Sequence, residues 1–256
     1  MPDPAVLKRI SAGFLEAAAQ GRTVQDIGPF RAFFSASPEP FLSLALPREN
    51  TGDWASSIAS LETTFAERDR TPRLEVLAEL FPKLGGALER AGFTRDDEAP
   101  VMALAAGSFI PVIPDADYTD ADYRPLTAGE GLRAVLGAQS RAYGGSGDGS
   151  DWLPQLEVGL EAGHILGAAL WRGGEPVAGA TVILGGEVGE LAGVFTDASF
   201  RRRGLAGRVC KPLLSTFFAA GGRLCWLSAA PGAEGLYRRL GFSEVGTQVN
   251  YSKSPY

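Results

Sequence analysis

Apolar residues in the second half of the chain recur at two different spacings. Three apolar runs, ILGAALW, PVAGATVIL and GELAGVFT, are joined by the glycine-containing turns RGGE and GGEV. Short apolar runs between such turns are typical of neighbouring antiparallel strands. Leu205, Val209, Leu213 and Phe217 then repeat every four residues, which is the spacing of an amphipathic helix, and Pro212 predicts a kink within it. The pattern therefore predicts a three-stranded meander followed by a helix.

The segment after this helix predicts a return to the same sheet. The helix ends at two glycines, which can adopt the left-handed backbone that closes a helix. LCWLS, residues 224–228, follows as a short apolar run typical of a strand buried on both faces. A strand, a helix and a strand in this order require a parallel crossover, so we expect an α/β fold with a mixed sheet.

The first half carries a weaker pattern of the same kind. Apolar residues at helical spacing predict helices over residues 54–68 and 74–90, the second kinked at Pro82. Two strands are expected between residues 30 and 46. The Pro- and Asp-rich residues 110–124 favour neither element, so we place a domain boundary there. This gives a smaller α/β domain at residues 1–115 and a second domain at residues 116–256.

Composition narrows the classes of partner. The chain has 24 basic and 30 acidic side chains among 256 residues, a formal charge of -6, which opposes broad binding to nucleic acid or an anionic membrane. No apolar run resembles a secretory leader or a membrane span, so we expect a cytoplasmic protein. Cys210 and Cys225 are expected to be reduced thiols, and the single histidine, His164, gives no metal-ligand pattern.

An anion site is predicted where three arginines meet a glycine. A predicted strand ends at Thr196, and the loop after it carries Arg201, Arg202, Arg203 and Gly204 before the helix begins. Unpaired backbone N–H groups and the positive end of the helix would meet there, and the arginines add charge-assisted hydrogen bonds. The alternative is a basic turn that faces water, because charge clusters are usually solvated.

Two motifs resemble those of the GNAT acetyltransferase superfamily. Residues 201–206, RRRGLA, match the pattern Arg/Gln-x-x-Gly-x-Gly/Ala of its acetyl-CoA loop, and residues 235–242, GLYRRLGF, resemble its Leu-Tyr-x-x-x-Gly-Phe helix. The resemblance covers residues 165–251, and the residues from 122 onward are compatible with the family's first strand and two helices. The chain departs from the family at Ala198, where proline is common, and at Ala230, where asparagine often stands. The phosphate-loop and dinucleotide-binding glycine motifs do not match this loop.

The resemblance implies a site for acetyl-CoA as co-substrate. Main-chain groups of Val194, Phe195 and Thr196 would pair with the pantetheine arm as an added strand does, which requires this strand and the LCWLS strand to diverge. The pyrophosphate would lie in a loop of consecutive residues: Arg201, Arg202, Arg203, Gly204, Leu205, Ala206 and Gly207. The implied activity is direct acetyl transfer to a primary amine of a small molecule or a protein. The alternative is a catalytically inactive acyl-CoA-binding sensor or structural module.

Acetyl transfer needs an acid, an oxyanion donor and a base. Tyr237 is our candidate acid, because a phenol with a reference pKa of about 10 stays protonated at neutral pH; a packing role is the alternative. A backbone N–H near Val194 could hold the oxyanion. Glu190 is the candidate base, since strand parity puts it on one face with Ala192 and Val194; a solvent-facing carboxylate is the alternative. His164 has a suitable pKa, but its place at a strand start favours a structural or exposed role.

The first half echoes the second near residues 88–93. LERAGF followed by PVMALA resembles YRRLGF followed by a terminal strand, but this half lacks the pyrophosphate-loop motif. Either a degenerate GNAT-like repeat or two unrelated helices that end at a common glycine cap would account for this. No motif identifies the acceptor amine, and the oligomeric state stays open, a homodimer included.

Overall fold

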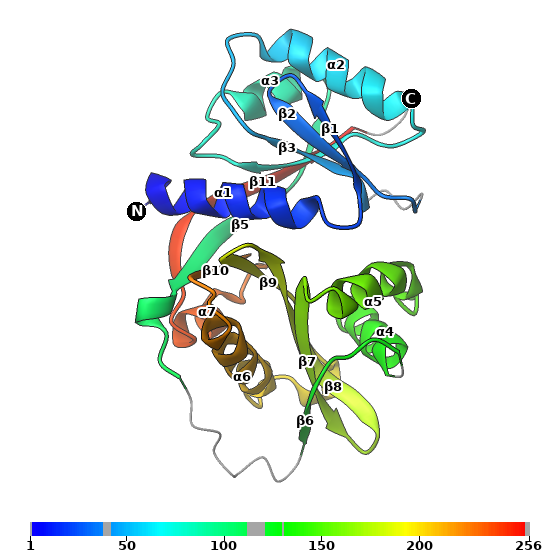
Figure 1. Cartoon of the computed structure of the whole chain (residues 1–256), viewed down its shortest axis with the longest axis vertical. Helices are drawn as coiled ribbons and strands as arrows, with labels where there is room; N and C mark the ends of the chain where they lie inside the picture. The colour runs from blue at the N-terminus through cyan, green and yellow to red at the C-terminus, as the bar shows by residue number, and fades with distance from the viewer. Residues whose placement is uncertain (1, 38–41, 112–120, 130, 254–256) are drawn as a thin grey trace. The chain divides into compact units, whose positions relative to one another are not determined.

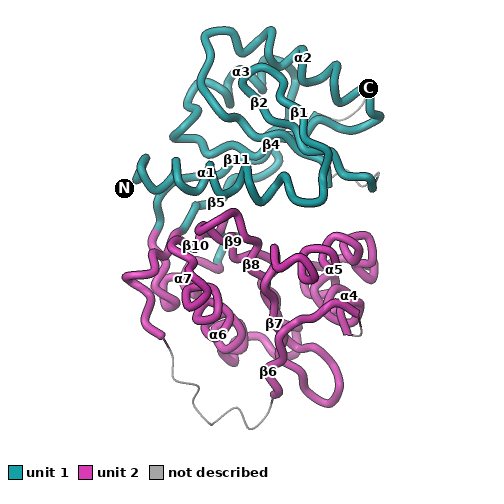
Figure 2. Tube along the Cα trace, in the orientation of Figure 1, with its two compact units in different colours: residues 1–102, 228–232, 244–256 teal, residues 103–227, 233–243 magenta. Residues whose placement is uncertain are grey.

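The computed structural model describes residues 2–37, 42–111, 121–129 and 131–253. The chain divides into two units that are discontinuous in sequence (Figure 2). Unit 1 comprises residues 1–102, 228–232 and 244–256, and unit 2 comprises residues 103–227 and 233–243. The boundary that the sequence predicts, between residues 115 and 116, lies outside the described residues. A single linear boundary does not describe these units, because the C-terminal segment belongs to unit 1.

Unit 1 is a sheet with helices on both faces (Figure 1). Its elements follow the chain in this order: α1 (Pro4–Ala18), β1 (Thr23–Ile27), β2 (Phe30–Phe34), β3 (Leu44–Pro47), α2 (Trp54–Ala66), β4 (Arg73–Leu77), α3 (Leu84–Arg90), β5 (Thr94–Ala105) and the final strand β11 (Ser243–Ser252). The strands are hydrogen-bonded in the order β1-β2-β3-β4-β11-β5. β3 and β4 pair in parallel, whereas β1–β2, β2–β3 and β4–β11 are antiparallel.

Alternation along β2 explains how unit 1 buries both faces of its sheet. Phe30 and Phe34 point into a core that includes Phe65 of α2, whereas Phe33 packs in a second cluster with Leu44 and residues of α1. Successive side chains of a strand point to opposite faces, so a helix is needed on each side. Asp53 caps the N-terminus of helix α2, because its carboxylate accepts a hydrogen bond from the Ser56 N–H at 3.0 Å.

The strands of unit 2 also form both parallel and antiparallel pairs, and helices lie on both faces of them (Figure 1). Its elements are β6 (Asp122–Pro125), α4 (Leu132–Ala142), α5 (Leu153–Glu161), β7 (Ile165–Arg172), β8 (Glu175–Gly185), β9 (Val188–Thr196), α6 (Leu205–Ala219), β10 (Leu224–Ser228) and α7 (Glu234–Arg239), with short 3₁₀ turns at Ala106–Ser108, Ser150–Trp152 and Ala198–Phe200. The strand order is β10-β9-β8-β7-β6, in which only β9 and β10 pair in parallel.

Helices α4 and α6 cover opposite faces of this sheet (Figure 1). Ala169 and Phe195 pack against Val135 and other residues of α4. On the other face, a Cβ at Gly189 would lie 2.8 Å from the ring of Phe217 in α6, so glycine allows this helix to approach the strand closely.

The structure confirms the predicted mixed α/β fold, the meander and the helix after the arginines. The predicted helix over residues 74–90 is wrong, because its first part is strand β4 and only α3 is helical. Leu74 and Val76 alternate into the core of unit 1 while β4 pairs with β11, so a distant strand overrides the helical spacing. Cys210 and Cys225 are both buried, free cysteines in this structure.

Candidate functional site

Strands β9 and β10 diverge part-way along their length. Their parallel pairing joins Val188 to Leu224, Gly189 to Cys225 and Glu190 to Trp226. Strand β9 continues to Thr196, beyond the last of these pairs. The edge of β9 that faces the split therefore offers main-chain N–H and C=O groups to a ligand with an extended, amide-bearing arm.

A β-bulge in β9 lies at the split. Ala180 of β8 faces both Gly193 and Val194, because the register shifts between the two regular stretches of the β8–β9 pairing. Gly193 has φ of 61°, in the left-handed region that favours glycine. A Cβ there would also lie 3.1 Å from Nε2 of Gln139 in α4. Bulges change the direction of the main chain locally, so this one sets how the Val194 peptide is presented at the split.

The arginine loop, residues 201–204, leads from β9 to the N-terminus of α6, and many backbone N–H groups in this region have no hydrogen-bond partner. Arg202 and Gly204 both have positive φ, 62° and 77°. No backbone N–H from Arg202 to Gly207 donates a hydrogen bond to another residue in the described part of the chain. A Cβ at Gly204 would meet no atom within 4 Å, so the loop is open at this point. Free amides and the positive end of a 15-residue helix are both features that favour an anion.

The arginine side chains differ in what they contact. Arg201 donates from Nη2 to the Ala142 carbonyl at 2.6 Å and from Nε to the Thr196 carbonyl at 3.3 Å. It therefore ties the end of α4 to the end of β9. The guanidinium of Arg203 lies 5.4 Å from the ring centroid of Phe200, and Arg202 is exposed. Arg202 and Arg203 therefore leave their positive charge at the surface of the loop.

Tyr237 of α7 is buried and packs edge-to-face against Phe242. Burial, with smaller effects from Cys210 and Tyr143, raises the pKa of Tyr237 above its ordinary value. Removal from water disfavours the phenolate, so the hydroxyl stays protonated at neutral pH, as its proposed role requires.

Tyr143, just after α4, is a site residue that the sequence analysis missed. Its hydroxyl donates to the Val194 carbonyl at 3.0 Å. Although 61% of the residue is exposed, desolvation, with a smaller effect from Cys210, raises the pKa of Tyr143 to about 12. In the sequence this tyrosine only ends an apolar helix before a glycine-rich loop, and the bond it makes spans 51 residues. No local motif could have identified it.

Glu190 and His164 lie on β9 and at the start of β7. Glu190 faces Ile183 of β8 and Trp226 of β10, on the sheet face that α4 and α5 cover. It shares that face with Ala192, but the bulge breaks the alternation before Val194 that the sequence analysis assumed. His164 is exposed, and its backbone carbonyl accepts the N–H of Leu184. No group of three His, Cys, Asp or Glu side chains among the described residues could hold a metal ion.

Comparison with known proteins identifies the fold and the family of one domain. Residues 136–242 match the family described as "Acetyltransferase (GNAT) family". These residues form a GNAT domain. It contains the split, the bulge, the arginine loop and Tyr237, so the two motifs singled out in the sequence belong to the matched segment. No curated protein matches the chain.

Solved structures resemble the chain along nearly its whole length, beyond the GNAT domain. A GCN5-related N-acetyltransferase from Kribbella flavida is 26% identical with a TM-score of 0.79, and the match covers 97% of this chain and 96% of that one. A putative GNAT acetyltransferase from Novosphingobium aromaticivorans has a TM-score of 0.64 at 17% identity, over 99% and 100% of the two chains. A tandem GNAT protein from the clavulanic acid biosynthesis pathway has a TM-score of 0.60 at 11% identity, over 100% and 98%.

Unit 1 repeats the element order of the GNAT domain. The series β3, α2, β4, α3, β5 corresponds to β9, α6, β10, α7, β11, and in each series a parallel strand pair flanks the first helix. With the tandem GNAT likeness, this supports the GNAT-like repeat over two unrelated helices. No helix in the described ranges is both long and apolar enough to cross a membrane.

Proposed function

We propose that the GNAT domain transfers an acetyl group from acetyl-CoA directly to a primary amine of a small molecule or a protein. The observation that carries the proposal is the divergence of β9 from β10 beside a loop of unpartnered amides. A split strand edge and an anion-binding helix start suit the two ends of one ligand, an amide-bearing arm and a diphosphate.

Coenzyme binding would rest mainly on the main chain. Val194, Phe195 and Thr196 would pair with the pantetheine arm along the open edge of β9. The diphosphate would lie against the loop made of Arg201, Arg202, Arg203, Gly204, Leu205, Ala206 and Gly207. Because Arg201 already donates to two protein carbonyls, its contribution is to hold the loop in place. Arg202 and Arg203 would supply charge.

Acetyl transfer forms a C–N bond to the amine and breaks the C–S bond of the thioester. The amine nitrogen attacks the thioester carbonyl carbon, the C–S bond breaks, the nitrogen loses a proton and the sulfur gains one. A backbone N–H at the bulge would stabilise the charge on the carbonyl oxygen. Tyr237 would give its proton to the leaving sulfur, since its raised pKa keeps it protonated until then, and the proton that leaves the amine would replace it by exchange through solvent. Glu190 would accept the proton from the amine, on the face that α4 and α5 cover.

An amine-panel assay that measures free thiol tests this proposal. Tyr237→Phe should lower turnover at least about tenfold and leave the affinity for acetyl-CoA within about twofold. Tyr251→Phe, the same chemical change in unit 1, is the control and should leave turnover unchanged. Acetyl-CoA binding without thiol release from any amine would favour the sensor alternative, and absence of binding would refute both.

A further inference from the structure

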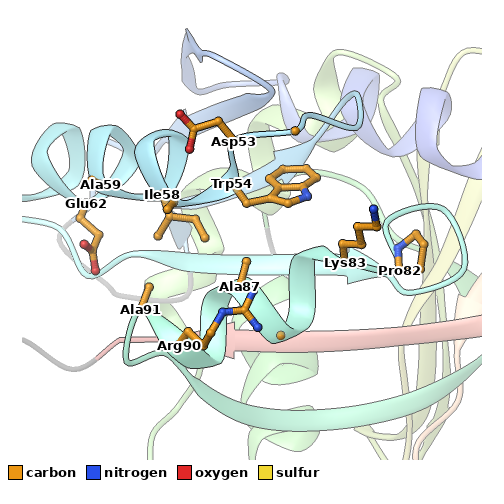
Figure 3. Close-up of a pocket in the computed structure, with 13 residues that line it drawn as sticks. Asp53, Trp54, Ile58, Ala59, Glu62, Pro82, Lys83, Ala87, Arg90 and Ala91 are labelled. Carbon is orange, nitrogen blue, oxygen red and sulfur yellow. The ribbon is translucent and has the colours of Figure 1, made fainter.

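A groove in unit 1, between α2 and α3, has no role in the proposed reaction. It has a volume of about 720 Å³. Figure 3 shows Trp54 and Ile58 of α2 on one side, and Ala87 of α3 with Ala91 just after it on the other. These side chains give the groove an apolar lining wide enough for a small organic molecule.

A buried donor without an acceptor lies in the wall of this groove. Trp54 is only 6% exposed, and its indole Nε1–H has no hydrogen-bond partner among the described residues. Buried polar groups are nearly always paired, so an orphaned indole N–H marks a place where an acceptor is missing. In Figure 3 the nitrogen lies on the edge of the ring nearer Lys83. The nitrogen itself is buried, so an acceptor atom reaches it only if a neighbouring side chain, such as the exposed Lys83, moves aside.

The charges around the groove favour an anion. Lys83 and Arg90 form no ion pair with any residue that the structure describes. The two acidic residues of the lining are already engaged, since Glu62 pairs with Lys253 and Asp53 caps α2 through the Ser56 N–H. Two exposed cations beside a wall with an unused N–H are suited to a carboxylate, which accepts several hydrogen bonds at once.

Glycine at position 86 is unexplained by packing and keeps the groove open. Gly85 is required, because a Cβ there would lie 2.5 Å from the hydroxyl oxygen of Tyr251. A Cβ at Gly86 would meet only Nη1 of Arg90, at 3.4 Å, and this is the end of a flexible side chain. Glycine is a poor helix former, so its presence here weakens α3 without relieving a fixed contact. A larger side chain would fill the space beside Ala87.

We propose that this groove binds a small carboxylic acid with an apolar body. One carboxylate oxygen would accept from the Trp54 indole, the charge would lie between Lys83 and Arg90, and the apolar body would lie against Ile58 and Ala59. The groove is not a second coenzyme site, because the N-terminus of α2 is occupied by the Asp53 carboxylate, which would repel a diphosphate. The proposal is independent of acetyl transfer by the GNAT domain.

Nuclear magnetic resonance of the full chain tests the proposal directly. Phenylacetate is the probe, phenylacetamide is its neutral counterpart, and Trp54→Phe assigns the indole resonance. Phenylacetate should shift the Trp54 indole signal saturably with a Kd on the order of 1 mM, which is ordinary for so small a ligand. Lys83→Gln or Arg90→Gln should each weaken binding about tenfold.

Two matched variants distinguish binding of the probe in the groove from an unspecific effect on the Trp54 signal. Ala59→Phe places a ring in the groove from an exposed position of α2 and should abolish the shift, whereas Ser60→Phe, exposed on the same helix but outside the lining, should preserve it. No saturable shift, an equal response to phenylacetamide, or full binding by Ala59→Phe would each overturn the proposal. It would also fail if acetyl-CoA shifted the Trp54 signal and Ala59→Phe abolished that effect, because the groove would then be a coenzyme site.

Discussion

The bulge at Gly193 can be tested by a single added methyl group. Gly193→Ala forces a side chain into the left-handed region, at a cost of about 1–2 kcal/mol. The new Cβ would lie 3.1 Å from Nε2 of Gln139, so that side chain must also move. If the bulge flattens instead, the Val194 peptide turns away from the split. Losing two main-chain hydrogen bonds of about 1 kcal/mol each would weaken acetyl-CoA binding roughly thirtyfold.

Gly173→Ala provides the matched control. Gly173 lies in the turn between β7 and β8 with φ of 58°, and a Cβ there would meet no atom within 4 Å. Both variants should lower the melting temperature, by about 2–4 °C per kcal/mol. Only Gly193→Ala should lose affinity for acetyl-CoA in titration calorimetry. Equal affinities in the two variants would refute the role given to the bulge.

Two further predictions concern helix α2 and the phenol at the split. Asp53→Ala removes the cap of α2 and should lower the free energy of unfolding in urea by about 1 kcal/mol, whereas Asp53→Asn should change it little; equal losses would contradict capping by the side chain. Because the pKa of Tyr143 is raised to about 12, the folded state keeps this proton after the unfolded chain, with a pKa of about 10, has released it. The free energy of unfolding should therefore fall as the pH rises through that interval, and Tyr143→Phe should make the fall shallower; an unchanged slope would show that the phenol is not desolvated.

Local sequence patterns were sufficient to predict the elements wherever residues that are close in sequence also contact each other in the fold. The meander and the arginine loop depend on turns, glycines and helical spacing that lie within a few residues of one another. The prediction of a helix over residues 74–90 was wrong for the opposite reason. Strand β4 is defined by pairing with β11, 170 or more residues away in the chain, and no local pattern contains that information.

The residues of the candidate site also fall into those that a local motif identifies and those that depend on distant parts of the chain. Gly204 and Tyr237 belong to motifs that are contiguous in sequence. The bulge at Gly193 shifts the register by one residue, which parity along a strand cannot anticipate, so the shared face expected for Glu190 and Val194 could not be tested from the sequence. Tyr143 reaches the site only because α4 packs over β9.

Binding of a diphosphate by the free amides at the start of α6 is the central claim, and Gly204 tests it most directly. Asparagine and aspartate have nearly the same size, and both tolerate the left-handed backbone of Gly204, so Gly204→Asn and Gly204→Asp differ mainly in one negative charge. At about 5 Å from a diphosphate that carries about two negative charges, and at an effective dielectric of about 40, that charge opposes binding by about 3 kcal/mol, roughly a hundredfold. Calorimetry with acetyl-CoA should show binding by the unaltered chain and by Gly204→Asn, and binding about a hundred times weaker by Gly204→Asp. Equal affinities of the two variants, or no binding by the unaltered chain, would contradict the claim.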